Sequence, residues 1–180
     1  MITRYETLLV VVDFQERLLP SIHDAGEMLR RAERLIRGAR LLDIPILITE
    51  QYPRGLGSTA EGVIDALGDA YRPIEKAAMS TMGEPAFAEA LAAAGRRQVL
   101  LCGIEAHVCV YQSAAQMREQ GYDVHLVADC TSSRCEADAR IAIDRMQQLG
   151  CRLTTHEMAI FEMLRVSGTS EFKAWVQIIR

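Results

Sequence analysis

Apolar residues along the chain fall into short uninterrupted runs that alternate with longer stretches of helical periodicity. Runs of this kind are typical of strands buried on both faces, as in parallel sheets covered by helices. The four clearest are Leu8–Val12, Ile44–Ile48, Val99–Cys102 and Val124–Ala128, and weaker strands are expected near Ile74–Lys76 and Cys151–Thr154. The pattern therefore predicts a mainly parallel sheet of about six strands.

Between the runs, apolar residues recur at helical spacing opposite charged residues. The expected helices are Met28–Leu42, a segment that starts at Pro85, and a segment that carries Ala139, Ile143 and Met146. Three glycines each close a helical pattern shortly before a strand, as capping glycines do: Gly95, Gly121 and Gly150. This alternation predicts a single domain over residues 1–180 with an α/β fold, a Rossmann-like three-layer α/β/α sandwich.

Composition narrows the functional classes. The 180 residues are 49% hydrophobic and carry a net charge of −4, and no cluster of Lys and Arg suggests nucleic acid or an anionic membrane as a partner. The longest apolar runs last about five residues, whereas a bilayer span needs roughly 20. The N-terminus leads directly into a strand and does not resemble a signal peptide. Five cysteines without disulfide-scaffold spacing favour a reducing, cytoplasmic location.

The cysteines do not suggest a metal site. Cys130 and Cys135 have four residues between them, and the chain has no CxxC motif and no histidine pair at ligand spacing. We therefore expect neither a metal nor another cofactor. Most of the cysteines are expected to be small buried hydrophobic residues.

Three polar residues stand at predicted strand ends, where doubly wound sheets carry their sites. Asp13 follows the first strand directly, Lys76 closes a weaker strand, and Cys109 lies at the start of a helical pattern after the strand Val99–Cys102. Free backbone amides in a first helical turn favour a thiolate, and a nearby lysine lowers a thiol pKa further. Taken singly, each residue is also compatible with a turn, a solvated surface position or a buried cysteine.

Taken together, the segments around these residues resemble the signature segments of isochorismatase-like cysteine hydrolases. The segments are Leu9–Gln15, Glu75-Lys76 with Ser80–Met82, and Gly103–Val110, and further similar stretches are Thr49–Gly57, Thr131–Arg134, Thr155–Met158 and Phe161-Glu162. The resemblance covers residues from about 7 to 165 in the expected order. It is greatest to the small isochorismatase-domain-containing proteins.

The resemblance implies an Asp–Lys–Cys triad of Asp13, Lys76 and Cys109. Cys109 would attack a carbonyl carbon, Asp13 would carry the thiol proton to a leaving amine, and a thioester would be hydrolysed by water. Lys76 would hold Asp13 and stabilise the thiolate. The family also implies an oxyanion hole of the Glu105 and Cys109 backbone amides and a cis peptide bond at Ile104–Glu105.

This chain differs from other branches of the family, and the differences narrow the class of substrate to be expected. Nicotinamidase relatives bind a metal through an Asp-x-His pair and a further histidine between the second and third strands, but this chain has no histidine from Asp24 to Ala106. True isochorismatases lack the cysteine nucleophile. Retention of Cys109 therefore implies hydrolysis of an amide-like C–N bond in a small molecule. Candidates for the pocket wall, with ordinary core or loop packing as the alternative, are Phe14, Leu19, Gln51, Tyr52, Leu56 and Tyr111.

Two nearby polar residues receive smaller roles. His107 is two residues before Cys109, a spacing at which side chains on a helix do not face each other, so a Cys–His dyad is not expected. Arg134 is a candidate anchor for a substrate carboxylate or an ordinary loop residue.

Other functions remain open at this point. A nucleotide-binding Rossmann domain is strongly disfavoured, because it needs a glycine-rich turn after the first strand and Asp13–Arg17 contains no glycine. A catalytically silent protein that binds partners, or that senses oxidants through Cys109, is the main alternative to an enzyme. The family resemblance implies a homo-oligomer. The amphipathic segment Phe172–Ile179 is expected to pack on its own domain or on a neighbour.

Overall fold

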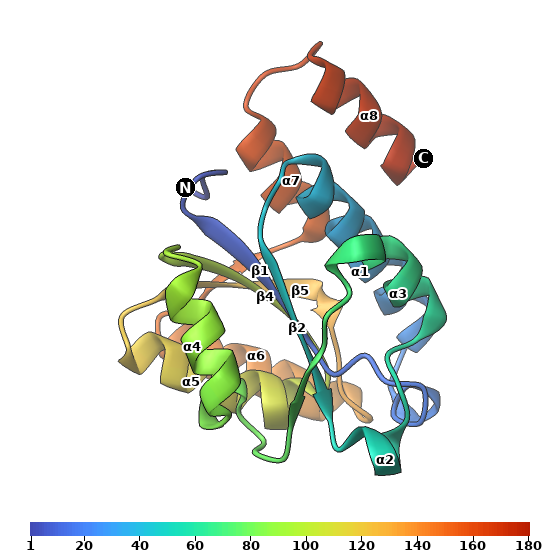
Figure 1. Cartoon of the computed structure of the whole chain (residues 1–180), viewed down its shortest axis with the longest axis vertical. Coiled ribbons are helices and arrows are strands. Elements are labelled where there is room, and N and C mark those ends of the chain that lie inside the picture. The colour runs from blue at the N-terminus through green and yellow to red at the C-terminus, as the bar shows by residue number, and fades with distance from the viewer.

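The computed structural model describes residues 1–180. Six parallel strands form one sheet in the order β3-β2-β1-β4-β5-β6. Their bounds are β1 Thr7–Val12, β2 Ile46–Gln51, β3 Ile74–Lys76, β4 Gln98–Gly103, β5 Asp123–Thr131 and β6 Arg152–Thr154. With helices on both sides of the sheet (Figure 1), the predicted three-layer α/β/α fold is confirmed.

The helices divide between the two faces of the sheet according to the core they join. Residues of α1 (Ala25–Leu41), α3 (Glu61–Leu67), α7 (His156–Leu164) and α8 (Ser170–Ile179) pack in one buried cluster. Residues of α4 (Pro85–Ala93), α5 (Tyr111–Glu119) and α6 (Glu136–Gln148) pack in the other. The short helix α2 (Pro53–Leu56) lies beyond the carboxyl end of β2.

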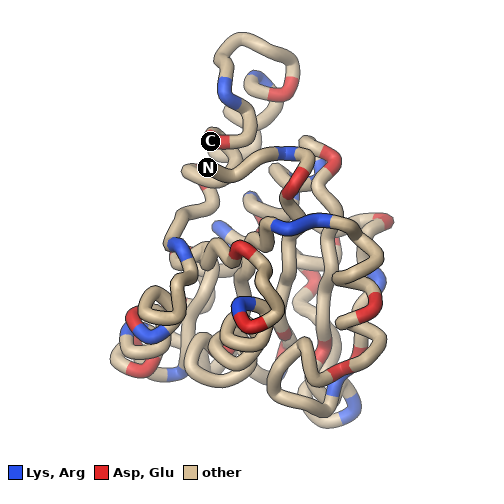
Figure 2. Tube along the Cα trace, turned by 90° about the vertical axis from the view of Figure 1, so that its left-hand side faces the viewer, with Lys and Arg blue, Asp and Glu red and all other residues tan.

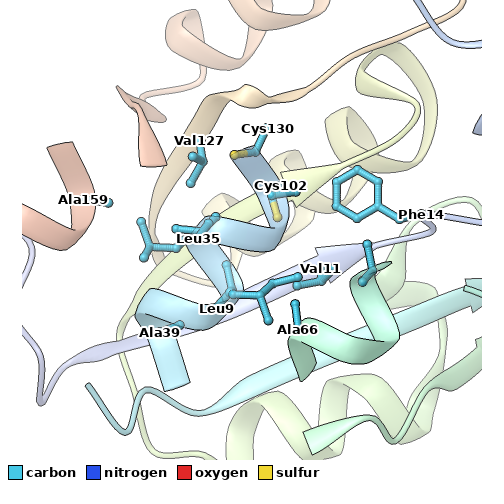
Figure 3. Packing of buried hydrophobic residues seen from close by; sticks show 14 of the residues in the cluster. Leu9, Val11, Phe14, Leu35, Ala39, Ala66, Cys102, Val127, Cys130 and Ala159 are labelled. Atoms are coloured by element: carbon cyan, nitrogen blue, oxygen red, sulfur yellow. The ribbon is translucent and has the colours of Figure 1, made fainter. Parts of the chain in front are cut away.

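Strand β1 shows why both faces need covering. Leu9 and Val11 point into the cluster with α1, as Figure 3 shows, whereas Leu8 and Val10 point into the opposite cluster. All four side chains are fully buried. Alternation of side chains across a strand thus turns one apolar run into the centre of two cores.

One predicted strand is displaced by the end of the preceding helix. The sequence predicts a strand at Ile44–Ile48, but β2 begins at Ile46. The Ile44 amide instead bonds to the Ala39 carbonyl at 2.9 Å, with Asp43 in the left-handed conformation at φ 52°. This is the hydrogen bond that closes a helix in a Schellman motif, so the burial of Ile44 belongs to the helix end rather than to the sheet.

The other predicted helix boundaries are confirmed. Pro85 starts α4, and Gly95, Gly121 and Gly150 follow helices with φ between 65° and 85°. The C-terminal segment packs on its own domain, where α8 contacts α1 and fully buries Trp175. Figure 2 shows acidic and basic residues interspersed along the chain. None of the helices has the length and apolar character needed to cross a bilayer.

Candidate active site

The site lies where the strand order reverses. From β1 the chain builds β2 and β3 to one side and then returns to add β4 on the other side of β1. Val12 and Gly103, the last residues of these two strands, are directly paired, and the Ile104 amide donates to the Val12 carbonyl at 3.0 Å. A Cβ on Gly103 would stand 2.2 Å from that carbonyl oxygen, so only glycine allows this approach. Asp13 and the turn before Cys109 therefore emerge side by side.

Asp13 is held in a buried ion pair. It adopts a left-handed conformation at φ 54°, which aspartate tolerates better than most residues. Its Oδ1 accepts a hydrogen bond from Thr49 Oγ1 at 2.7 Å, and its Oδ2 lies 2.7 Å from Lys76 Nζ. Both side chains of the pair are fully buried. Apart from this ion pair, Oδ2 has no partner.

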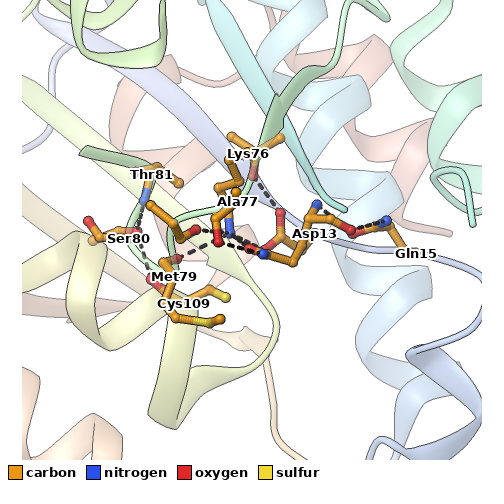
Figure 4. Close-up of polar contacts among 12 residues, drawn as sticks. Asp13, Gln15, Lys76, Ala77, Met79, Ser80, Thr81 and Cys109 are labelled. Atoms are coloured by element: carbon orange, nitrogen blue, oxygen red, sulfur yellow. Dashed lines mark hydrogen bonds and ion pairs between the residues drawn. The ribbon is translucent and has the colours of Figure 1, made fainter. Parts of the chain in front are cut away.

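The long side chain of Lys76 reaches Asp13 across β2, the strand between them. Besides Asp13, its Nζ donates to Gln51 Oε1 at 2.5 Å and contacts the Met79 and Ala78 carbonyls at 3.1 and 3.3 Å (Figure 4). Gln51 Nε2 in turn donates to the Ala77 carbonyl. Gln51 is therefore a hydrogen-bond partner that positions the lysine, a role that its position in the sequence did not reveal.

Cys109 lies in a π-helical turn, Ala106–Val110, that precedes α5, rather than in the first turn of an α-helix as the sequence predicted. The Val110 amide bonds to the Glu105 carbonyl at 3.2 Å and closes the wide turn. Ser113 Oγ donates to the Cys109 carbonyl at 2.6 Å and accepts from the Thr81 amide at 2.8 Å. This link ties the cysteine to the loop that follows Lys76. Single π-turns are frequent at functional sites.

The charge state of Cys109 differs from the prediction. Burial, and then the negative charge of Asp13, raise the pKa of its thiol to about 11, while Lys76 acts in the lowering direction. The expected thiolate, favoured by helix amides and a lysine, is wrong for this structure because the thiol is 7% exposed and faces a carboxylate. The resting site thus pairs a neutral thiol with a nearby proton acceptor.

The turn before the cysteine contains the expected cis peptide bond between Ile104 and Glu105. The Glu105 amide donates no hydrogen bond to the protein, and the Cys109 amide donates none outside its own helical turn. Backbone amides near a nucleophile are groups that can hold a developing oxyanion.

Most of the predicted pocket residues lie elsewhere. Phe14 is fully buried and Leu19 is 8% exposed, and both belong to the core cluster with α1. Tyr111 turns toward α6, where its hydroxyl accepts from Arg145 at 2.6 Å and its ring lies under the guanidinium. Leu56, on α2, lines none of the main cavities.

Tyr52 alone of these candidates lines a hollow beside the triad. It is 60% exposed and borders a cavity of about 300 Å³ with Pro53, Arg54, Glu75, Lys76 and Ala77. None of the main cavities is lined by Asp13 or Cys109. The hollow therefore meets the triad at Lys76.

The two neighbouring polar residues have partners of their own. His107 Nδ1 lies 2.9 Å from Ser133 Oγ, which agrees with the expectation that it forms no dyad with Cys109. Arg134 donates to Glu105 Oε2 at 2.9 Å, so its guanidinium is occupied by a carboxylate of the chain itself. The sequence also gave no role to Thr49, although Thr49, Glu50 and Gln51 form a polar end to β2 that could have indicated one.

Fold and site together define a doubly wound α/β protein with an Asp–Lys–Cys cluster at the switch point of its sheet. The isochorismatase domain model matches residues 7–158. Mouse isochorismatase domain-containing protein 2A is 39% identical over 176 residues, which are 97% of this chain and 82% of the mouse protein. The chain belongs to the isochorismatase domain family. This membership supports a hydrolase of the cysteine-hydrolase type.

Other relatives extend the comparison. Isochorismatase domain-containing protein 1 of Salmo salar is 37% identical over 97% of this chain, which spans 61% of the salmon protein. The structure described as the MAR1 ribonuclease of Caenorhabditis elegans has a TM-score of 0.92 at 37% identity and covers 99% of this chain and 91% of its own. The Escherichia coli YcaC protein, described as an octameric hydrolase of unknown specificity, shares the fold at a TM-score of 0.92 and 23% identity, covering 98% and 89%.

Proposed function

We propose that this protein hydrolyses an amide-like C–N bond of a small molecule through a thioester on Cys109. The observation that carries the proposal is the neutral, buried thiol beside an ion-paired carboxylate. A neutral thiol is a weak nucleophile and needs a base at the moment of attack. Asp13 supplies that base, and its Oδ2 has a lone pair that no other hydrogen bond uses.

In the first half-reaction, the Cys109 thiol proton moves to Asp13 as sulfur bonds to the carbonyl carbon. The C–N bond then breaks, and Asp13 gives the proton to the leaving amine. Lys76 keeps the carboxylate oriented and balances the negative charge, since its ammonium lies 2.7 Å from Oδ2. The backbone amides of Glu105 and Cys109 hold the oxyanion, an interaction that elsewhere contributes about 2.7–4 kcal/mol per donor.

In the second half-reaction, Asp13 takes a proton from water while the oxygen attacks the thioester carbon. The C–S bond breaks, the acid is released, and the proton on Asp13 returns to the sulfur. One group thus acts as base and as acid in turn, which general acid–base catalysis permits when the carboxylate stays within reach of both partners. The reaction uses no group outside the chain other than substrate and water.

RNA cleavage is the second candidate, and the likeness to the structure described as the C. elegans MAR1 ribonuclease favours it. The charge of this chain does not. Its net charge is −4, and the hollow beside Lys76 is lined by Glu75 as well as Arg54 and is not a basic groove. A thiol sensor, the other alternative, needs a reactive cysteine but no proton acceptor beside it.

A turnover screen separates these functions. The wild type, Cys109→Ala and Asp13→Asn are incubated with small primary amides, ureido compounds and activated esters, and in parallel with a single-stranded RNA. We expect release of ammonia or amine from the amides by the wild type only, because Cys109→Ala lacks the nucleophile and Asp13→Asn lacks the base. RNA cleavage that survives in Cys109→Ala, without amide turnover in the wild type, would overturn the proposal. Homo-oligomerisation stays a prediction, to be measured by light scattering on the same samples.

A further inference from the structure

A second cluster of reactive side chains lies outside the triad. Asp129 and Cys130 stand near the end of β5, and His156 is the first residue of α7. One potential ligand atom from each residue lies within 4.8 Å of the other two. The three offer a carboxylate oxygen, a sulfur and an imidazole nitrogen, which are the donor types that Zn²⁺ takes in proteins.

An irregularity in β5 brings the two neighbouring residues together. In a regular strand, consecutive side chains face opposite sides of the sheet. Here the register between β4 and β5 shifts between Leu101 and Gly103, and the pairing of β5 with β6 ends at Val127. Within the irregular segment, Cys130 Sγ lies 3.7 Å from Asp129 Oδ1. Bulges of this kind often redirect a side chain beside a functional site.

The third member is fixed to the first by two contacts. The His156 backbone amide donates to Asp129 Oδ1 at 2.9 Å, and its ring Nδ1 lies 2.6 Å from Oδ2. The residue is 5% exposed, and its Nε2 is buried without a hydrogen-bond partner, with Glu157 Oε1 at 3.9 Å. The protein's own contacts therefore use one of the two ring nitrogens. Buried nitrogen atoms without a partner are rare and call for a ligand or an ion.

Two cavities border Asp129 or His156, whereas Cys130 is fully buried. One of about 560 Å³ is lined by both Asp129 and His156, and another of about 330 Å³ is lined by Asp129. Arg31 borders both cavities, but its guanidinium is held by Glu27 at 2.9 Å. Three protein ligands, of which Asp129 and His156 border the open space, match zinc sites that keep one position for water.

We propose that Asp129, Cys130 and His156 form a binding site for one Zn²⁺-like divalent cation. Binding releases the Cys130 thiol proton to solvent, and the neutral imidazole keeps its one proton on the nitrogen that the metal does not take. The thiolate and the carboxylate then balance the two charges of the ion. Tetrahedral zinc ligands lie about 3.3–3.8 Å apart, so side-chain shifts of about 1 Å complete the site. The sulfur ligand excludes Mg²⁺ and Ca²⁺, which prefer oxygen.

Cobalt substitution tests the site directly, because thiolate-bound Co²⁺ has a strong charge-transfer absorption. The untagged, reduced, metal-free protein is titrated with Co²⁺ and then with Zn²⁺. We expect one equivalent of Co²⁺ to produce the thiolate band and Zn²⁺ to remove it. Cys130→Ser should lose the band. His156→Gln should bind Co²⁺ more weakly, with a Kd raised by more than the 10–100-fold that is typical when a residue hydrogen-bonded to a metal ligand is lost.

Matched controls locate the site. His125 forms a similar buried pair with Asp123 at 3.2 Å, and Cys151 is another buried thiol. His125→Gln, Cys151→Ser and Cys109→Ala should therefore keep the band. Circular dichroism verifies that each variant is folded, and a Cys130→Ala variant replaces Cys130→Ser if the latter unfolds. Absence of the band in the wild type, or its loss in Cys109→Ala with retention in both Cys130 variants, would overturn the assignment.

Discussion

Replacement of Asp13 by asparagine should make Cys109 easier to alkylate while it abolishes turnover. The carboxylate of Asp13 is the second-largest cause, after burial, of the raised pKa of the thiol, and Lys76 opposes it. Asp13→Asn removes the negative charge and leaves the lysine, so the Cys109 pKa should fall. The same change removes the base, and loss of a general base costs about 10²–10⁴-fold in rate. In Asp13→Asn the alkylation rate of Cys109 should thus rise while the turnover rate falls.

The size of the effect follows from the thiolate fraction. At pH 7 a thiol with a pKa of about 11 is ionised to roughly one part in 10⁴, against about 3% for an ordinary cysteine. A more basic thiolate is also more nucleophilic, which raises the alkylation rate again by a factor of about ten. Cys109 of the wild type should therefore react about 30-fold more slowly than an unperturbed thiol, before any loss of access. Its rate should climb with pH up to about 11.

Peptide-resolved mass spectrometry after timed exposure to iodoacetamide measures this rate at each pH. The exposed Cys135 provides a reference in the same chain, and unfolding curves establish that Asp13→Asn remains folded. The midpoint of the pH profile reports the pKa independently of access. A wild-type midpoint at or below about 8.5, the ordinary value, would refute the raised pKa on which the need for a base rests. An unchanged or higher midpoint in Asp13→Asn would refute the assigned cause.

Further predictions concern the lysine and the packing of α1. Lys76→Met leaves the Asp13 carboxylate buried without a counterion and should lower the free energy of urea unfolding by about 3–5 kcal/mol; a loss under 1 kcal/mol would speak against a charged pair. Gln51→Leu removes the acceptor at 2.5 Å from Nζ and should lower kcat about tenfold or more, whereas an effect confined to KM would indicate a substrate contact instead. Gly38→Ala should destabilise the fold by about 1–3 kcal/mol despite the higher helix propensity of alanine, because the new Cβ would stand 2.8 Å from the indole of α8. Gly26→Ala, with open space around it, should be neutral or stabilising in the same urea unfolding assay, and equal effects at both positions would exclude the packing explanation.

The sheet and the residues at its switch point could be predicted because apolar runs, capping glycines and strand ends are recognisable from short stretches of sequence. The displaced start of β2 could not, since Ile44 is as apolar as a strand residue and only its bond to Ala39 reveals a helix end. Which side of an element a residue faces was also hidden. Phe14 and Tyr111 flank the triad in sequence but point into the core and toward α6.

Electrostatics and long-range clusters were beyond the sequence for a different reason. The thiol pKa depends on burial and on the balance between Asp13 and Lys76, and neither is visible from spacing. The Asp129–Cys130–His156 cluster joins residues from two elements through a bulge, whereas a search for CxxC and paired histidines detects only local ligand sets. Such features arise only once the chain is folded.

A thioester on Cys109 can be observed in the intact mass of the protein during turnover of the amide and ester panel. The wild type should gain the mass of one acyl group, and neutral hydroxylamine should remove it. Peptide mapping should assign the adduct to Cys109, and Cys109→Ala should stay unmodified. An adduct that persists in Cys109→Ala, or neither adduct nor turnover across the whole panel, would contradict the account.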